Sequence, residues 1–396
     1  MISDKKIAVI GLGYVGMPLV IESVLAGYNV VGLDTDLKKI TNLETGNTDL
    51  ENLSNNEFRS FLREKKIRFT TQYSELIHSE IVIICVPTPL DGIGKPDYSM
   101  LLNVVKNLQG NLQEDALVIL ESTVAPGITR TLVYENLVHL YPKIQVAYSP
   151  ERIDPSNKTW NLVNTPKIVS GISEEAKNNA LLFYSAFVQE LISAQSVEMA
   201  ETSKLLENSF RLINISFINE MNFFCDEIGV NLSEVIALAA TKPFGYMPFY
   251  PSIGIGGHCI PVDPVYLLEK SQAVGKELKM IVQAIEINKS IPSKVITKAH
   301  SLIGSLFKKK ILIIGISYKP NVNDVRETPV KDLIDLLEKE GAEVKWHDEI
   351  VKVWRGSESK PITNDYDLVI IGALHDYIEL GNLPRVPLIN CASLTT

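Results

Sequence analysis

The stretch Lys6-Ile7-Ala8-Val9-Ile10-Gly11-Leu12-Gly13-Tyr14-Val15-Gly16 decides the fold of the first half of the chain. Its opening run of apolar and branched residues predicts a short buried strand of a parallel sheet. Three glycines follow with the spacing Gly-x-Gly-x-x-Gly. A helical pattern then continues to Leu25, Gly27 ends it, and Asn29–Leu33 predicts a second strand that closes on Asp34. A strand, a glycine loop, a helix, a strand and an acid in this order form the dinucleotide-binding fingerprint.

Each part of this fingerprint has a physical role. Gly11 permits the turn, Gly13 lets the backbone approach a pyrophosphate, and Gly16 lets the helix pack closely on the strand. The helix N-terminus supplies amides and a partial positive charge to the phosphates. Asp34 would bind the ribose hydroxyls and repel a 2′-phosphate, so the sequence predicts NAD rather than NADP.

Composition and charge exclude several classes of protein. The 396 residues are 45% hydrophobic and 21% charged, which is typical of a globular chain with two or three domains. A net charge of -9 without a basic run argues against nucleic acid as a partner. We expect no membrane segment and no signal peptide. Four scattered cysteines predict neither a disulfide framework nor a metal site, and the chain is expected to be cytoplasmic.

Further strands alternate with helices after the fingerprint. Apolar runs at 81–86, 116–120 and 144–148 predict strands, and polar residues follow their ends: Thr88, Ser122, Thr123, Glu151 and Arg152. In open α/β sheets, ligands bind outside the carboxyl ends of the strands, so one cleft could hold Thr88, Ser122, Thr123 and Glu151. The alternatives are a helix cap for Thr123 and a surface carboxylate for Glu151.

The middle of the chain predicts a long helix. From Ser196 up to Gly229 the chain contains no proline and no other glycine, and apolar residues recur at helical spacing. Such a helix spans about 50 Å, so it must bridge domains or form an oligomer seam. Lys204 and Asn208 are four residues apart and share one face, although a surface lysine is the alternative. A second helix is predicted through residues 278–291.

Between these two helices lies a loop, residues 243–264, rich in proline and glycine. Its aromatic content argues against disorder, and Gly254, Gly256 and Gly257 would let the backbone approach a ligand just before Cys259. The functional interpretation is that Cys259 is a nucleophile on a rigid loop. The alternative is an inert thiol in a buried loop.

The last third predicts a second βαβ pattern. Strands are expected at 311–316, 343–347 and 367–372, with a helix at 330–341. Because no Gly-x-Gly-x-x-Gly follows the first of these strands, the second sheet is expected to bind something other than a dinucleotide. Lys319 and Arg326 lie in the loop where that strand ends, where phosphate groups could bind.

An NAD site combined with a reactive cysteine suggests a particular chemistry. NAD can accept a hydride from an alcohol without help from a cysteine, whereas an aldehyde releases a hydride only after a nucleophile has added to it. A thiolate provides that adduct, oxidation yields a thioester, and water releases the acid. The combination predicts oxidation to an acid, with Lys204 stabilising the alkoxide and Glu151 as general base.

The order of the motifs resembles the UDP-sugar 6-dehydrogenase family, also named the UDP-glucose/GDP-mannose dehydrogenase family. The matching stretches extend along nearly the whole chain: 11–16, 86–89, 121–127, 149–151, 201–208, 256–263 and 318–327. The resemblance implies a two-step, four-electron oxidation of the sugar C6 alcohol with two NAD. Rival interpretations are an enzyme that stops at the aldehyde or ketone, a non-catalytic nucleotide-sugar sensor, and a protein whose long helix serves assembly.

The resemblance also implies roles for individual residues. Cys259 is the nucleophile, Lys204 and Asn208 stabilise the oxyanion, Glu151 is the base for thioester hydrolysis, and Thr123 with Asp263 positions the water. The predicted cofactor contacts are Gly11, Gly13, Tyr14, Val15, Gly16, Asp34, Thr88, Ser122, Thr123 and Arg326. The predicted substrate contacts are Glu151, Arg152, Lys204, Asn208, Arg211, Phe249, Tyr250, Gly256, Gly257 and Lys319.

One departure concerns the sugar. The UDP-glucose branch typically has a lysine where this chain has Val262, and the form Gly-Gly-His-Cys-Ile-Pro-Val-Asp-Pro at 256–264 is similar to UDP-N-acetylhexosamine dehydrogenases. The favoured substrate is UDP-N-acetylglucosamine, with the manno epimer second and UDP-glucose third.

The implied fold is an α/β protein with two Rossmann-like doubly wound domains joined by a long central helix and a helical dimerisation core. The predicted domains are an NAD-binding domain at 1–195, a central helical domain carrying the cysteine loop at 196–300, and a UDP-sugar-binding domain at 301–396. A homodimer through the central helices is expected.

Overall fold

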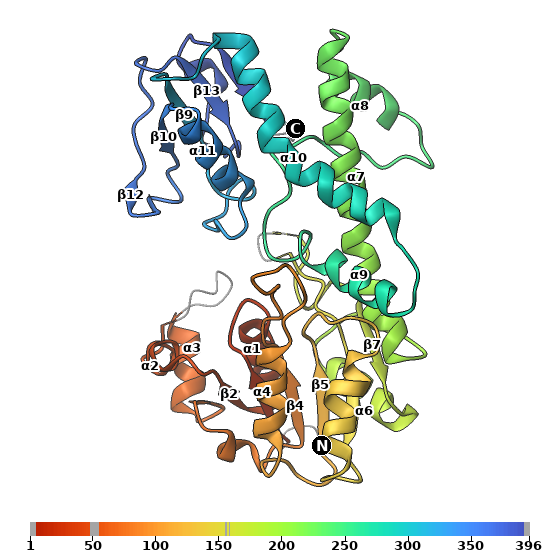
Figure 1. Ribbon diagram of the computed structural model, residues 1–396. Helices are drawn as coiled ribbons and strands as arrows, with labels where there is room; N and C mark the ends of the chain where they lie inside the picture. Colours follow the sequence, from red (N-terminus) through yellow and green to blue (C-terminus); the bar gives the residue numbers. More distant parts are fainter. Residues whose placement is uncertain (1–4, 48–54, 155–156, 158, 392–396) are drawn as a thin grey trace. The chain divides into compact units, whose positions relative to one another are not determined.

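The computed structural model describes residues 5–47, 55–154, 157 and 159–391 (Figure 1). Contacts divide the chain into two compact units. The first unit comprises Met1–Leu206 with Val265–Ala273, and the second comprises Glu207–Pro264 with Val274–Thr396. The helix α7, Val197–Glu227, contributes to both units and confirms the long helix expected at 196–229.

The first unit is built on an eight-stranded sheet with the order β3-β2-β1-β4-β5-β6-β7-β8. The first six strands are parallel, whereas β7 runs antiparallel to β6 and β8 pairs parallel to β7. The strands are β1 Lys6–Ile10, β2 Asn29–Leu33, β3 Ile67–Thr70, β4 Ile81–Ile84, β5 Leu117–Leu120, β6 Gln145–Tyr148, β7 Lys167–Gly171 and β8 Leu191–Ser193.

Helices cover both faces of this sheet because alternate residues of each strand point to opposite sides. Ile7 and Val9 of β1 pack with α1 (Gly16–Leu25), α2 (Leu37–Glu44), α3 (Asn55–Arg63) and α6 (Glu174–Tyr184). Ala8 and Ile10 pack on the other face with α4 (Ser99–Leu108), α5 (Glu135–Val138) and the first turn of α7. Both faces are therefore buried, as the apolar strand runs predicted.

The turn after β1 requires a glycine. Gly11 has a φ of +92°, and a Cβ at this position would lie 2.8 Å from the carbonyl oxygen of Cys85. Its N–H donates to the carbonyl of Leu33 at 2.8 Å, which ties the turn to the end of β2. Only a residue without a side chain tolerates both constraints.

The second unit contains a four-stranded parallel sheet with the order β10-β9-β13-β14. Its strands are β9 Lys310–Ile314, β10 Glu343–His347, β13 Leu368–Ile371 and β14 Leu388–Asn390, and a small hairpin joins β11 Val353–Trp354 to β12 Ser357–Glu358. The helices are the rest of α7, α8 Leu232–Ala240, α10 Lys279–Ile303 and α11 Pro329–Lys339; α9 Asp263–Ala273 begins here.

Helix α10 is longer than the sequence predicted. The expected helix covered residues 278–291, but α10 continues through Pro292 to Ile303 (Figure 1). A proline inside a helix loses one backbone hydrogen bond. Here Ile291, Val295 and Ala299 are buried in the core formed with β9, β13 and α11. Burial of this apolar face compensates for the lost bond.

The second sheet repeats the first turn of the Rossmann pattern without its glycine spacing. Gly315, after β9, has a φ of +76°, and its N–H donates to the carbonyl of His347 at 2.9 Å. Asp348 follows β10 and accepts from the N–H of Ile316 at 3.0 Å. Asp34 makes the equivalent hydrogen bond in the first unit, where it accepts from the N–H of Leu12 at 3.0 Å.

The two aspartates differ in what else they bind. Nε2 of His375 lies 3.0 Å from Oδ2 of Asp348, and the two side chains are fully buried. The N–H of Asn321 donates to Nδ1 of His375 at 2.9 Å, so the hydrogen of the neutral ring is on Nε2 and points at Asp348. His375 therefore occupies Oδ2 of Asp348, the kind of carboxylate oxygen that a ribose hydroxyl would bind at Asp34.

We predict that Asp348→Ala destabilises the second unit. The carboxylate accepts from the N–H groups of Ile316, Ile350 and Val351 as well as from His375. Leaving buried donors unpaired costs about 1–3 kcal/mol each, so the free energy of unfolding should fall by about 3 kcal/mol or more. Denaturant titration followed by fluorescence of the buried Trp346 measures the change. The control Asp335→Ala removes an exposed ion pair with Arg355 and should cost less than about 1 kcal/mol. Equal losses would contradict the prediction.

The same carboxylate makes stability depend on pH. Burial raises the pKa of Asp348, but the hydrogen bonds from His375, Val351 and Ile316 outweigh it, and the pKa lies below the ordinary 3.8. A lowered pKa means that the stabilisation is complete above 3.8 and is lost as the pH falls further.

Candidate active site

The parallel strands of the first unit bring several predicted site residues to one edge of the sheet. β1, β4, β5 and β6 are consecutive neighbours, and their carboxyl ends lead into the glycine loop, Thr88, Thr123 and Glu151. Oγ1 of Thr88 donates to the carbonyl of Thr123 at 2.7 Å, and Oγ of Ser122 donates to the carbonyl of Val86 at 2.7 Å. These hydroxyls tie the loops after β4 and β5 together.

The alternative role for Thr123, a helix cap, is not what the structure contains. The next helical element after Thr123 spans Thr129–Tyr134, and its N-cap is Ile128. The turn between them is held by Glu201 of α7, whose carboxylate accepts from the N–H groups of Gly127 at 2.6 Å and Thr129 at 2.9 Å. Burial raises the pKa of Glu201 to about 7, although these hydrogen bonds oppose the shift. Sequence reasoning assigned no role to Glu201.

The glycine loop and Asp34 fit a dinucleotide. A Cβ at Gly13 would meet nothing within 4 Å, so the backbone there is open to a close approach. The N-cap position of α1 is Val15, and no side-chain hydrogen bond caps the helix, so no side chain competes with an anion there. Tyr14 is 65% exposed. The fit rests on these features together, because each one alone is common.

Asp34 has a partner that sequence reasoning missed. Its Oδ2 accepts from Nζ of Lys39 at 2.7 Å as well as from Leu12, and its Oδ1 accepts from the N–H of Asp36 at 3.0 Å. Burial raises the pKa of this carboxyl, but the hydrogen bonds from Lys39 and the two amides outweigh it, and the pKa is lowered. Asp34 is therefore ionised at neutral pH. The spacing of five residues between Asp34 and Lys39 was the only signal in the sequence for this contact.

Two further predicted residues of the first unit are buried rather than exposed. Lys204 of α7 is 9% exposed, which argues against the surface lysine. The side chain of Glu151 is 14% exposed, and its Oε1 accepts from the N–H groups of Arg152 and Ile153, both at 2.6 Å. Arg152 donates from Nη1 to the carbonyl of Pro166 at 2.6 Å.

In the second unit, the structure brings Asn208 and Asp263 together. Nδ2 of Asn208 donates to Oδ2 of Asp263 at 2.5 Å, and both side chains are buried. The N–H of Asp263 donates to the carbonyl of Cys259 at 2.8 Å, and Cys259 itself is exposed. The start of α9 thus links the cysteine turn to Asn208 of α7, which the i, i+4 spacing places on the same helix face as Lys204.

The loop that carries Cys259 is held at several points along its length. Oδ1 of Asn219 accepts from the N–H of Ser252, and Oδ1 of Asn288 accepts from the N–H of Ile255, both at 2.7 Å. A Cβ at Gly256 would lie 2.6 Å from the carbonyl oxygen of Glu327, and one at Gly257 would lie 2.9 Å from the ring of Tyr318. The chain's own packing therefore requires these glycines, whatever ligand they contact.

The other predicted contacts of the second unit lie in different surroundings. Phe249 and Tyr250 pack against Ile218, Cys225 and Ile236, and the rings of Phe249 and Phe210 are 5.8 Å apart. Arg211 is exposed. Nζ of Lys319 lies 5.8 Å from the ring centre of Tyr318. Arg326 is bound by Asp324 through Nε at 3.0 Å and Nη2 at 2.6 Å, so a role toward phosphates requires it to share that carboxylate.

The predicted site residues belong to both units. Thr123, Glu151 and Lys204 lie in the first, and Asn208, Cys259 and Asp263 lie in the second. Their assembly into one active centre therefore stays a prediction.

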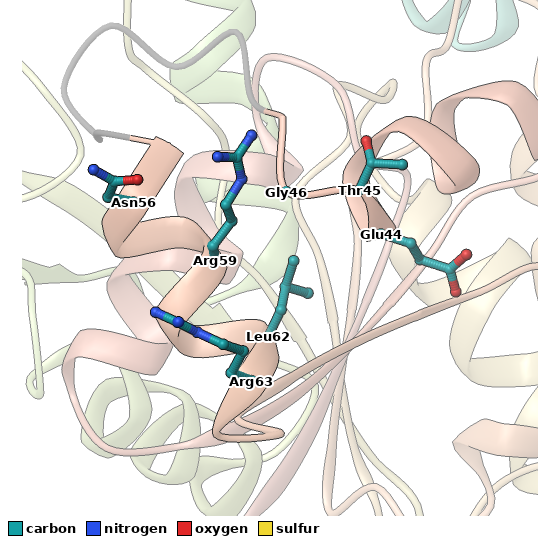
Figure 2. Close-up of a pocket in the computed structure, with 7 residues that line it drawn as sticks. All are labelled: Glu44, Thr45, Gly46, Asn56, Arg59, Leu62 and Arg63. Carbon is teal, nitrogen blue, oxygen red and sulfur yellow. The ribbon is translucent and has the colours of Figure 1, made fainter.

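A cavity of about 490 Å³ lies beside α2 and α3 of the first unit (Figure 2). Figure 2 shows its lining residues, which are Glu44, Thr45, Gly46, Asn56, Arg59, Leu62 and Arg63. None of the predicted site residues lines it, so it is separate from the candidate site.

Comparison with known proteins identifies the family, and the matches lie between residues 5 and 383. Three domain models of the UDP-glucose/GDP-mannose dehydrogenase family match in order: the NAD binding domain at residues 5–188, the central domain at 198–290 and the UDP binding domain at 312–383. The chain belongs to the UDP-glucose/GDP-mannose dehydrogenase family. It is an NAD-dependent nucleotide-sugar dehydrogenase, and the predicted cofactor and fold class are confirmed. The predicted domain boundaries stay predictions.

Relatives in this dehydrogenase family match over nearly their full length. UDP-N-acetyl-D-mannosamine dehydrogenase of Methanocaldococcus jannaschii is 33% identical over 98% of this chain and 90% of its own. UDP-N-acetyl-D-glucosamine 6-dehydrogenase of Salmonella typhi is 32% identical over 96% and 92%. The solved structure of UDP-D-ManNAc dehydrogenase from Pyrococcus horikoshii superposes with a TM-score of 0.89, 30% identity and coverage of 98% and 95%.

Two features are absent from the residues of this dehydrogenase that the structure describes. No helix among them is both long and apolar enough to cross a bilayer. They also contain no group of three or more His, Cys, Asp or Glu side chains arranged to hold a metal ion.

We predict that Asp34→Ala reduces the preference of this dehydrogenase for NAD over NADP. Removal of the carboxylate abolishes both its bond to a ribose hydroxyl and its repulsion of a 2′-phosphate. The ratio of kcat/KM for the two cofactors should fall at least about tenfold, which corresponds to about 1.4 kcal/mol. Lys39→Met is the matched control: it leaves the carboxylate unneutralised, so the preference for NAD should stay or increase. An unchanged ratio in Asp34→Ala would place discrimination at another residue.

Proposed function

We propose that this dehydrogenase oxidises the C6 hydroxymethyl group of a UDP-N-acetylhexosamine to the carboxylate in two steps, through a thioester on Cys259. The observation that carries the proposal is the display of Cys259. Its thiol is exposed on a loop pinned by Asn219 and Asn288, immediately before the buried Asn208–Asp263 pair. An enzyme that stopped at the aldehyde would have no need of such a thiol.

The chain's own residues perform the following steps. NAD, when bound, accepts one hydride in each oxidation. After the first oxidation, the Cys259 thiolate adds to the aldehyde carbonyl, and the amide of Asn208 and the ammonium of Lys204 stabilise the oxyanion. After the second oxidation the adduct is a thioester. Water then attacks its carbonyl, a C–O bond forms, Glu151 takes the proton, and the C–S bond breaks to return the thiolate.

The surroundings of Asn208 support its role in this scheme. Because Oδ2 of Asp263 accepts one hydrogen of the Nδ2 group, the orientation of the amide is fixed and the other hydrogen is left for an oxyanion. A preorganised donor costs nothing to orient at the moment of reaction. Burial of the pair strengthens the effect, since few water molecules compete for the amide.

The N-acetylhexosamine class is supported by Val262 and by the relatives. Val262 is 6% exposed, and its N–H donates to the carbonyl of Cys259 at 3.2 Å, so an apolar residue is packed into the cysteine turn. The sequence favoured the gluco epimer. Relatives named for the manno epimer match at 33% and 36% identity, and those named for the gluco epimer match at 32% and 30%. The manno epimer is therefore the first substrate to test, with the gluco epimer and UDP-glucose beside it.

We predict that Cys259→Ala abolishes formation of the uronic acid. The wild-type enzyme should produce two NADH per UDP-sugar consumed, whereas the variant has no nucleophile to convert the aldehyde and should lose at least about 10³-fold in acid formation. Its affinity for NAD should stay within about threefold, because the thiol is not part of the glycine loop. The readouts are NADH absorbance and mass analysis of the sugar product. Cys391→Ala is the control and should leave the rate unchanged. A Cys259→Ala variant that still makes the acid would exclude the thiol from the mechanism.

We also propose that a second copy of this chain covers an apolar stripe on α7. Phe210, Phe217 and Phe224 recur every seven residues and Leu206 lies one turn earlier, so all four fall within about 40° on one face. They are 45%, 57%, 55% and 63% exposed, respectively. A stripe of this length on one helix face is typical of a helix–helix interface.

We predict a homodimer of about 88 kDa, twice the chain mass of 44.0 kDa, by light scattering after size exclusion. Phe217→Glu combined with Phe224→Glu would bury two charges in the interface, and the dimer dissociation constant should rise at least about 100-fold. Ile93→Glu replaces another exposed apolar residue, in the first unit, and should leave the mass unchanged. A double variant that remains dimeric would show that this stripe is not the interface.

A further inference from the structure

A buried cluster of charged side chains lies where the strands β5, β6 and β7 of the first sheet meet the loops around Glu121 and Glu151. The steps proposed above use only one of its members, Glu151. Lys167 is the first residue of β7 and is 4% exposed. Its Nζ lies 3.1 Å from Oε2 of Glu121 and 3.6 Å from Oε2 of Glu151. The phenol of Tyr184 donates to the other oxygen of Glu121, which is 2% exposed.

The reversal of β7 places the lysine there. β6 and β7 are antiparallel and pair Ala147 with Gly171 and Tyr148 with Ser170. Continued three residues beyond Tyr148, this register sets Glu151 opposite Lys167, in agreement with their contact. A parallel strand in the same position would have carried its first residue to the far edge of the sheet.

The two oxygens of Glu151 have different surroundings. Oε1 is fixed by the N–H groups of Arg152 and Ile153. Oε2 is buried and has no hydrogen-bond donor among the described residues, and the ammonium of Lys167 is its charged neighbour. This oxygen therefore keeps its capacity to accept a proton from water, and the ammonium of Lys167 lies 3.6 Å from it.

We propose that Lys167 is a positioning residue that orients the carboxylate of Glu151 for hydrolysis of the thioester on Cys259. Glu121 and Tyr184 in turn hold Lys167. This inference rests on the proposed function, because it assigns Glu151 the proton from the attacking water. Lys167 itself transfers no proton, and the bonds formed and broken are those of the hydrolysis step.

The electrostatics of the cluster agree with this assignment. Burial lowers the pKa of Lys167, but the neighbouring carboxylates of Glu121 and Glu151 outweigh it and the net pKa is raised, so the ammonium stays charged. Burial raises the pKa of Glu121 to about 7, although Lys167 opposes the shift. Burial and Glu121 also raise the pKa of Tyr184, which therefore keeps the proton that it donates.

The test removes the ammonium without leaving the buried carboxylate of Glu121 unpaired. Lys167→Met is combined with Glu121→Gln, since Gln still accepts from Tyr184; Lys167→Gln with Glu121→Gln is a second version. Turnover mixtures are quenched with acid, and intact mass measures the acyl adduct on Cys259. We expect kcat for acid formation to fall about tenfold, a fraction of what a general base contributes. KM for the UDP-sugar should stay within about threefold, and the adduct should accumulate.

Three further variants serve as controls. Glu121→Gln alone keeps the ammonium beside Glu151, so its kcat should fall less than that of either double variant. Lys177→Met removes a lysine of α6 that pairs with the exposed Glu174 and should behave like the wild type. Glu151→Gln should itself accumulate the adduct, and adding the Lys167 and Glu121 changes to it should lower kcat no further.

The outcomes separate this inference from the proposed function. If Glu151→Gln accumulates adduct but neither double variant does, Lys167 has no part in positioning and the inference is overturned alone. If no variant accumulates adduct, the hydrolysis step assigned to Glu151 is wrong and the inference is overturned with it. The Lys167 and Glu121 changes could also lower kcat by the same factor in the wild type and in Glu151→Gln. That result would show that Lys167 acts on the fold and not through Glu151.

Discussion

In each sheet, the edge formed by the carboxyl ends of the strands depends on a turn that only glycine can make. After β1 and after β9 the backbone enters the left-handed region, at Gly11 and Gly315, with a neighbouring carbonyl occupying the space of a side chain. The glycine N–H bonds to the end of the adjacent strand, and the next amide then points at the aspartate that closes that strand. One backbone geometry thus fixes the loop, the strand end and the acid together.

The two units then use the same turn in different ways. In the first, Asp34 binds Lys39 in a partly buried position, and open backbone at Gly13 follows the turn. In the second, His375 closes off Asp348 inside the protein, and Tyr318 packs on the glycines of the cysteine loop. The family models agree with this division, since an NAD binding domain matches the first region and a UDP binding domain matches the second.

Features encoded locally could be predicted from the sequence. The strands β1, β2 and β10 have the expected bounds, α7 has almost the expected length, and the Asp34 fingerprint was visible because its parts are close together in the chain. Hydrophobic periodicity and glycine spacing are local properties, so they predict such elements well. The same reasoning ended α10 near Pro292, because a local rule for proline does not include the core that buries this helix.

Features that depend on pairing between distant segments could not be predicted. No residue within β7 indicates that it runs antiparallel to β6, and so Lys167 gave no sign of its contact with Glu151. Glu201, Asn219 and Asn288 act on loops about 33 to 74 residues away along the chain, through bonds to backbone amides that any sequence would offer. The geometric relation between the predicted residues of the two units stays a prediction for the same reason.

The unequal burial of the four cysteine side chains has a practical consequence. Cys225 is buried, and burial raises the pKa of the Cys85 thiol. Burial also raises the pKa of Cys391 to about 12, whereas Cys259 is exposed. Electrophilic dyes and peroxides react with accessible thiolates, so they should meet essentially one position on the native chain. A spectroscopic label could be attached there without mutating the remaining cysteines, and oxidative damage would be expected to begin at the same atom.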